Sequence, residues 1–185
     1  ADISPLDVSN ELNTLSPAPF AAFYKAKDDY LMCASPERYL RRSGTTIMTQ
    51  PIKGTAARGA SAELDELYRT QLQNSIKERA ENVMIVDLVR NDLSRCCETG
   101  SIKVDDLFCI HTFPQVHQMI STVSGKLAEG AMFTDAIRYS FPMGSMTGAP
   151  KFKVMQLIDE YERSRRTLFS GSVGYITPEG NFDLN

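Results

Sequence analysis

The sequence predicts a single α+β domain, because strand-like and helix-like stretches follow one another without internal repeats, low-complexity segments or a linker. Between residues 20 and 51, short stretches with strand character are separated by polar or turn-forming pairs: FAAFY, YLMCAS, YLRRS and TTIMTQ. From Ser61 onward, apolar residues recur at helical spacing instead. With 185 residues, 42% of them hydrophobic, the chain can bury one sizeable core.

A long helical stretch is expected from Ser61 to about Leu93. Ser61 is a suitable N-cap and is followed by acidic residues in the first turn. Because the span is long for one helix, we expect a break or kink near Asn74. Asp87 lies in the otherwise apolar run VMIVDLV, so we expect a buried carboxylate that pairs with Arg90 three residues later.

The second half of the chain is expected to return to strands before two further helices. Thr134 is the expected cap of a short helix, DAIRYSF, and a glycine-rich loop, PMGSMTGAPK, then leads into a helix that begins at Pro150. The basic cluster RSRR, residues 163–166, is interpreted as the last turn of that helix. The final residues predict a strand, a turn and the start of another strand, and this abrupt ending indicates an incomplete chain.

Composition argues against several classes of protein. A net charge of −3 without a basic stripe gives no case for nucleic-acid binding. No apolar run approaches the roughly eighteen residues of a membrane span, and the chain does not open with a signal peptide. Four cysteines without CxxC spacing and only two histidines argue against a zinc site, so we expect reduced thiols and a cytoplasmic location.

Glu37 and Lys53 are the first candidates for chemistry. They lie sixteen residues apart, in SPERYL and PIKGT. If strands joined by a hairpin carry them, a carboxylate and an amine can face one cavity, which suits a reaction in which one group leaves as another bond forms. The same spacing also fits an exposed cross-strand pair, and a loop lysine can simply be solvated. The spacing alone leaves these alternatives open.

Glu78 and Glu81 are candidate metal ligands, because residues three apart share one face of a helix. Mg²⁺ takes one or two protein carboxylates and keeps several waters, but a solvated helix face offers the same pair. The loop GSMTGAPK can expose backbone N–H groups to an anion or can be a tight structural turn, and it lacks the Gly-Lys-Ser/Thr of a Walker A loop. His117 stands alone on an alternating strand, and such a histidine is more often a hydrogen-bonded structural residue than a catalyst.

The order of these motifs resembles the chorismate-utilising enzymes. The resemblance covers about residues 16–185 and rests on six segments: SPERYL, PIKGT, KERAENVMIVDLVRNDLSR, FPQVHQMISTVSGKL, GSMTGAPKFKVMQLIDEYE and SGSVGYITPEGNFDLN. Within the family, the segments are most similar to the component I branch of aminodeoxychorismate (para-aminobenzoate) synthases. The component I branch of anthranilate synthases is the close relative.

The resemblance implies a fold and a domain. The family fold is α+β, with two large antiparallel sheets flanked by helices. Residues 1–185 would then form a single chorismate-binding catalytic domain that is incomplete at both ends. An N-terminal region would be missing, as would C-terminal strands with a substrate-binding arginine and a second acidic motif. The isolated chain is therefore expected to be inactive.

The resemblance also implies roles for individual residues. Glu37 matches the general acid for the departing C4 hydroxyl of chorismate, and Lys53 matches a lysine proposed to attack C2. His117 matches an active-site histidine. The other matches are ligands of Mg²⁺, which holds the ring carboxylate, and substrate-binding residues: Glu78 and Glu81 for the metal, and Thr55, Gly144 and Ser145 for the substrate.

The implied reaction is the conversion of chorismate and ammonia to 4-amino-4-deoxychorismate, in para-aminobenzoate and folate biosynthesis. A partner glutamine amidotransferase would supply ammonia from glutamine. Anthranilate synthases usually have alanine where this chain has Lys53, so Lys53 argues against the nearest alternative, an anthranilate synthase component I. A different alternative is a non-catalytic scaffold that docks a glutaminase.

Overall fold

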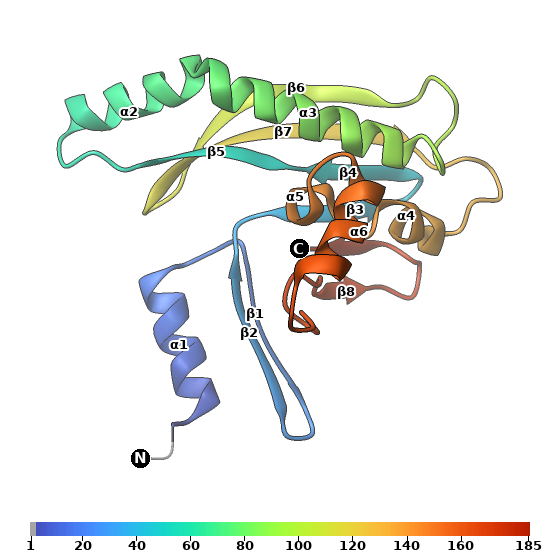
Figure 1. Ribbon diagram of the computed structural model, residues 1–185, viewed down its shortest axis with the longest axis horizontal. Coiled ribbons are helices and arrows are strands. Elements are labelled where there is room, and N and C mark those ends of the chain that lie inside the picture. The colour runs from blue at the N-terminus through green and yellow to red at the C-terminus, as the bar shows by residue number, and fades with distance from the viewer. Residues whose placement is uncertain (1–2) are drawn as a thin grey trace.

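The N-terminal half of the chain begins with a helix and continues in five strands (Figure 1). The computed structural model describes residues 3–185. Its first elements are α1 (Pro5–Leu15), β1 (Phe20–Ala26), β2 (Asp29–Ser35), β3 (Arg38–Ser43), β4 (Thr46–Gln50) and β5 (Ile52–Ala57). The four strand-like stretches are therefore confirmed. Lys53 lies inside the additional strand β5 rather than in a loop.

The expected long helical stretch consists of two consecutive helices, so the expected break near Asn74 is confirmed. They are α2 (Ala62–Asn74) and α3 (Ile76–Leu93). Ser61 caps α2 by accepting a hydrogen bond from the N–H of Leu64. Ser75 ends α2 and also caps α3, where its side chain accepts from the N–H of Glu78. A residue with extended backbone that caps the next helix breaks the helical hydrogen-bond pattern at this position.

The C-terminal half contains β6 (Lys103–Thr112), β7 (Val116–Lys126), α4 (Phe133–Ser140), α5 (Gly144–Thr147), α6 (Lys151–Tyr161), β8 (Gly174–Ile176) and β9 (Phe182–Leu184). Four sequence predictions were wrong here. The N-cap of α4 is Met132, whose N–H donates to Asp135, and not Thr134. Part of the expected glycine-rich loop forms the one-turn helix α5, and Pro150 precedes α6 as its N-cap. The RSRR cluster lies beyond the end of α6.

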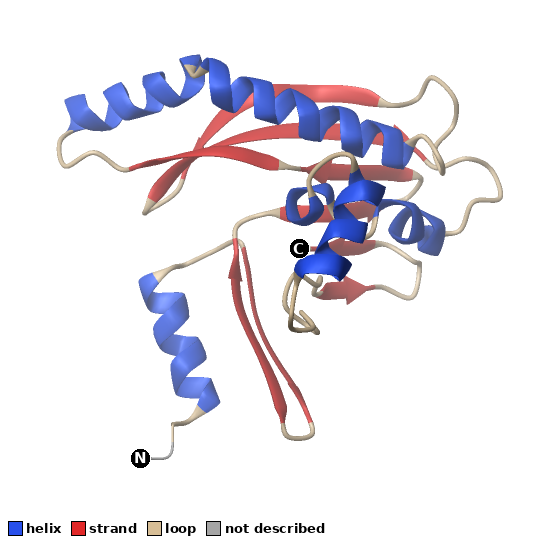
Figure 2. Cartoon of the chain, viewed as in Figure 1, coloured by secondary structure: helices blue, strands red, loops and turns tan. Residues whose placement is uncertain are grey.

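The strands form two antiparallel sheets, and the α+β class is confirmed (Figure 2). Strands β1 and β2 form a separate two-stranded sheet. The other sheet has seven strands in the order β5-β7-β4-β3-β9-β8, with β6 paired to β7. The long strand β7 pairs with β4 near one end and with β5 near the other, while β6 lies along its opposite edge. Helices α2 and α3 run across one face of this sheet (Figure 1).

Alternating side chains of β7 face the two helices and build the core. His117 contacts Asp65 of α2, and the hydroxyl of Ser121 donates to Oδ1 of Asn82 in α3 at 2.5 Å. The expectation that Asp87 is buried was wrong, because its side chain is 64% exposed. Its pairing with Arg90, at 3.0 Å, is confirmed. The helical period turns Ile85 and Val86 toward the sheet and leaves Asp87 on the outer face.

No helix in residues 3–185 is long and apolar enough to cross a membrane.

Candidate active site

Glu37 lies between β2 and β3, with its carboxylate against the start of β5. Because Arg38 pairs with Gln50 across the β3–β4 hairpin, the preceding Glu37 comes next to the residues that follow β4. Its Oε1 accepts a hydrogen bond from the N–H of Ile52 at 3.3 Å. Burial raises the pKa of Glu37 above its ordinary value, and the Ile52 amide, the Ser145 hydroxyl and the Lys53 ammonium offset part of that rise. A raised pKa suits a group that must hold a proton.

Lys53 is the residue after Ile52 and is half-buried in β5. Its positive charge is close enough to lower the pKa of Glu37. The pairing of β5 with β7 shifts register between Ile52 and Thr55, and Gly54 in this irregular part has a φ of 97°. A positive φ is easily reached only by glycine, so Gly54 allows the strand to bend directly beside Lys53. The structure therefore places Lys53 one residue after the amide that binds Glu37, although no ion pair joins the two side chains among the described residues and Lys53 lines neither cavity that Glu37 borders.

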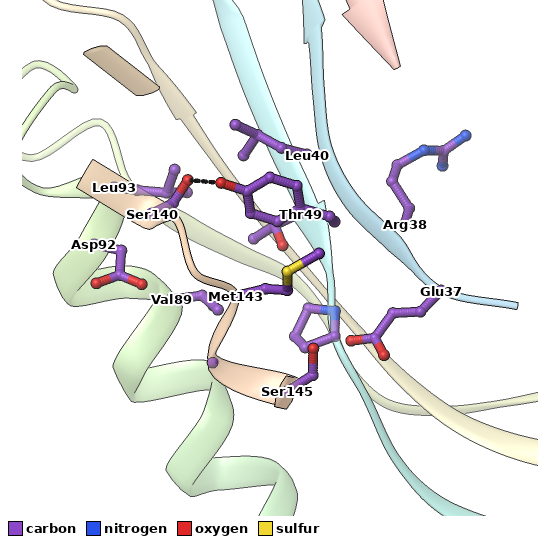
Figure 3. Close-up of a pocket in the computed structure, with 13 residues that line it drawn as sticks. Glu37, Arg38, Leu40, Thr49, Val89, Asp92, Leu93, Ser140, Met143 and Ser145 are labelled. Carbon is purple, nitrogen blue, oxygen red and sulfur yellow. Dashed lines mark hydrogen bonds between the residues drawn. The ribbon is translucent and has the colours of Figure 1, made fainter. Parts of the chain in front are cut away.

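Gly144 and Ser145 line the same cavity as Glu37, and α5, which carries them, packs closely against α3. A Cβ atom on Gly144 would lie 2.5 Å from Cδ2 of Leu88 and 2.8 Å from Cδ1 of Ile85. Glycine at this position lets the two helices approach. Figure 3 shows the Ser145 hydroxyl and the Glu37 carboxylate near each other on one side of the cavity that both residues line.

Two neighbouring cavities share four residues of this region: Glu37, Tyr39, Met143 and Ser145. The cavity in Figure 3 encloses about 20 Å³, which is room for a single water molecule. The second cavity measures about 420 Å³ and is also lined by β2 and by residues 168–173. Only the second cavity is large enough for a small-molecule substrate. Glu37 borders both.

Glu78 and Glu81 lie on the same face of α3 and converge on one cation. The ammonium of Lys77 is 3.7 Å from Oε1 of Glu78 and 3.8 Å from Oε1 of Glu81. Glu78 also touches β5, since a Cβ atom on Gly54 would lie 3.3 Å from its Oε2. Glu78 is therefore next to the strand that carries Lys53, whereas the side chain of Glu81 is 47% exposed.

The carboxylates of Glu78 and Glu81 fit Mg²⁺ and would supply part of its coordination. Two carboxylates that already share one cation offer the hard oxygen ligands that Mg²⁺ takes. Within residues 3–185, no group of three or more histidine, cysteine, aspartate or glutamate side chains gathers at one point to hold a metal. Water or substrate oxygens would have to complete the coordination around Glu78 and Glu81.

His117 and Thr55 lie apart from the two cavities. His117 is 1% exposed, with Nε2 at 3.0 Å from Oδ1 of Asp65 and Nδ1 at 2.9 Å from Oγ1 of Thr112. Both ring nitrogens are thus engaged by neighbouring side chains. Thr55 is exposed on β5 and is paired in register with Gln118 of β7. Neither residue lines a cavity that contains Glu37.

Sequence reasoning missed a buried ion pair whose Asp92 lines the same small cavity as Glu37, on the opposite side (Figure 3). Lys151 of α6 donates to Oδ2 of Asp92, at the end of α3, at 2.6 Å. Both residues fall in the RNDL and GAPK segments, but 59 positions separate them. Arg38 was missed as well, although it binds Asp183 of β9 at 2.8 Å. Local spacing carries no signal for pairs formed between distant segments.

Comparison with known proteins identifies relatives over the whole chain. A family model described as chorismate binding enzyme matches residues 1–185. Aminodeoxychorismate synthase component 1 of Klebsiella aerogenes is 46% identical over 173 residues, which are 94% of this chain and 38% of the relative. The protein of the same name from Escherichia coli K12 is 44% identical over 95% of this chain and 39% of its own length.

Anthranilate synthases are also similar. Anthranilate synthase component 1 1 of Haloarcula marismortui is 40% identical over 100% of this chain and 38% of its own length. The crystal structure of anthranilate synthase component I from Streptococcus pneumoniae TIGR4 superposes with a TM-score of 0.89 at 33% identity, covering 100% of this chain and 40% of that one. The chain thus spans about two fifths of the length of these relatives.

Proposed function

The chain belongs to the family of chorismate binding enzymes, and on this premise we propose that it carries the acid and the nucleophile of an aminodeoxychorismate synthase. The observation that supports this proposal most directly is the position of Glu37. Its half-buried carboxylate accepts a hydrogen bond from the N–H of Ile52. The charge of the next residue, Lys53, lies close enough to lower the pKa of Glu37. An acid and an amine that share one site suit the replacement of a hydroxyl group by an amine.

In the proposed reaction, the neutral amine of Lys53 attacks C2 of chorismate. A bond forms between C2 and Nζ, both ring double bonds shift, and the C4 hydroxyl leaves as water with a proton from Glu37. The Glu37 carboxylate then takes a proton from the new ammonium. Ammonia adds at C4, both double bonds shift back, and Lys53 leaves C2 as a neutral amine with the proton that Glu37 returns. The new ammonium at C4 then gives a proton to Glu37, which restores the acid. The product is 4-amino-4-deoxychorismate, which keeps the enolpyruvyl group.

The charge states of the two groups must differ from those of a simple ion pair. A nucleophilic amine must be neutral and a general acid must be protonated, whereas an ion pair stabilises the opposite states. Burial of Glu37 favours its protonated form and so supports the assignment of the acid.

Glu78 and Glu81 would hold Mg²⁺, which supplies positive charge for binding the ring carboxylate of the substrate. The position of Glu78 beside Gly54 supports a site next to Lys53. Gly144, Ser145 and Thr55 are proposed to contact the substrate. His117 enters the proposal as a positioning residue, because Asp65 and Thr112 occupy both of its ring nitrogens.

The proposed partner is a glutamine amidotransferase subunit that supplies ammonia. The word component in the names of the relatives supports an assembly of more than one part. The product would serve para-aminobenzoate and folate biosynthesis. A cytoplasmic location is proposed as well. All four cysteines are free thiols, and the cytoplasm is a compartment that keeps thiols reduced.

Anthranilate synthase is the second candidate, favoured by the TM-score of 0.89 to a structure of that name. The experiment that separates the candidates is product analysis of the whole protein that contains this chain, supplied with chorismate, Mg²⁺ and ammonium. Mass spectrometry and NMR would locate the new nitrogen. We expect 4-amino-4-deoxychorismate. Anthranilate, isochorismate or unchanged chorismate would each reject the proposal, and unchanged chorismate would favour a docking scaffold.

A further inference from the structure

A buried ion pair closes the segment that carries Gly144 and Ser145. The ammonium of Lys151 donates to Oδ2 of Asp92 at 2.6 Å and to the backbone oxygen of Ser140 at 2.9 Å. The side chain of Asp92 is 6% exposed and that of Lys151 is 16% exposed. Ser140 and Lys151 are the two ends of the segment 140–151. One ammonium group therefore holds both ends to the last turn of α3.

Ser140 links the same ion pair to the strand that follows Glu37. Its hydroxyl donates to the backbone oxygen of Ala136 at 2.6 Å and accepts from the hydroxyl of Tyr39 at 2.7 Å (Figure 3). Tyr39 is two residues after Glu37 in the chain. The segment is thus held at its ends by α3 and β3, and its middle contains α5 with Ser145.

We propose that Asp92 and Lys151 are positioning residues whose ion pair keeps the Ser145 hydroxyl beside the Glu37 carboxylate. The inference rests on the proposed function, in which Glu37 is the acid. A buried ion pair is a costly way to stabilise a fold, because two charges lose their hydration, and apolar residues of similar volume often serve as well. A role in holding the segment 140–151 in one position explains why a buried ion pair is present here.

The Ser145 hydroxyl lies close enough to Glu37 to influence the pKa of its carboxyl. The Ser145 hydroxyl lowers the pKa of this carboxyl, against the larger effect of burial, because a hydrogen-bond donor favours the charged form. The other groups that act on the carboxyl are the Ile52 amide and Lys53, so Asp92 and Lys151 do not act on it directly. A change at Glu37 after loss of the ion pair would therefore report a change in position.

The test is the titration of Glu37 by NMR in protein labelled with ¹³C at the glutamate side-chain carboxyls, with the Glu37 signal assigned by its absence in Glu37→Gln. The variant Asp92→Asn/Lys151→Met removes both charges, so that neither stays buried alone. We expect its Glu37 midpoint to lie at higher pH than in the wild type. Ser145→Ala should give an upward shift of similar size. The triple variant should shift no further than Ser145→Ala, because one contact can be lost only once.

The matched control is Asp87→Asn/Arg90→Met, which removes an exposed ion pair from the same helix and should leave the midpoint unchanged. Three results would overturn the inference. They are a folded Asp92→Asn/Lys151→Met variant with the wild-type midpoint, shifts that add in the triple variant, and loss of folding by circular dichroism, since the pair would then support the fold as a whole. A different reaction product would reject the proposed function but leave these midpoints as they are.

Discussion

Glu37 and Ile52 are joined by a hydrogen bond in which the backbone N–H of Ile52 donates to Oε1 of Glu37 at 3.3 Å. The bond ties the carboxylate to β5, the strand in which Lys53 follows Ile52. The donor belongs to the backbone of the residue before Lys53, so the bond holds the carboxylate near the start of the strand that carries the amine. This relationship supports the proposal that an acid and a nucleophile share one site.

Lys53→Ala tests the nucleophile. In the whole protein with chorismate, Mg²⁺ and ammonium, we expect formation of 4-amino-4-deoxychorismate to fall by more than about a hundredfold, while chorismate binding survives. Loss of a solvated residue would change energies by only about ±0.5 kcal/mol and leave the rate alone. Steady-state rates, chorismate binding by calorimetry and a search by mass spectrometry for a substrate adduct on Lys53 measure the difference. Normal turnover by the variant would end the nucleophile hypothesis and reopen the anthranilate synthase alternative.

Glu81→Gln tests the metal site. Because the side chain of Glu81 is 47% exposed, we expect little change in the free energy of unfolding but a clear rise in the Mg²⁺ concentration needed for half-maximal turnover. Asp87→Asn on the same helix is the control, since Asp87 is also exposed and pairs only with Arg90 among the described residues. An unchanged response of Glu81→Gln to Mg²⁺ would count against the assignment.

The 185-residue chain by itself is expected to form no 4-amino-4-deoxychorismate. Its described residues offer Mg²⁺ only the pair Glu78 and Glu81, and no third acidic or histidine side chain joins them there. Two carboxylates alone hold Mg²⁺ weakly against its hydration. Product analysis of the purified chain at high Mg²⁺ and ammonium is the measurement, and any product above the enzyme-free control contradicts the expectation.

Glu37→Gln is expected to stabilise the fold at neutral pH. Because burial raises the pKa of Glu37, the folded protein holds this proton more tightly than the unfolded chain does. Stability is therefore lost as the pH rises from the ordinary value of about 4.3 through the raised pKa. Urea unfolding should show the variant more stable than the wild type at pH 7, with the advantage shrinking toward pH 4. The exposed Glu129→Gln should show no such trend, and an equal stability of wild type and Glu37→Gln at both pH values would refute the expectation.

Asp65→Asn is expected to have the opposite pH dependence. The guanidinium of Arg58 and the N–H of Gly59, together with His117, hold the pKa of Asp65 well below its ordinary value. The stability from this carboxylate is present above the ordinary pKa of about 3.9 and is lost as the pH falls through the lowered pKa. The variant should be less stable than the wild type at pH 7, and the difference should diminish in strong acid. A constant difference at every pH, measured by urea unfolding, would show that shape rather than charge matters at this position.

Several elements could be predicted because their causes are local. Ser61 caps a helix with a side chain that reaches a donor three residues away, and the change from alternating to helical period marks where the strands end. The errors came where packing overrides local preference. Asp87 lies in an apolar run but on the outer face of α3, and four residues of the glycine-rich loop form α5 because Gly144 packs against Leu88.

The sequence by itself determined most of the order of strands and helices, apart from α1, β5 and α5, and identified the candidate reactive groups, because period, caps and residue chemistry are properties of short segments. It identified Glu37 and Lys53 without deciding whether they meet. The tertiary structure decided that Glu37 lies against Ile52, the residue before Lys53, through the β3–β4 register. It also turned His117 toward Asp65 and joined Asp92 to Lys151. Such contacts depend on strand register and helix packing between distant segments, which no local spacing encodes.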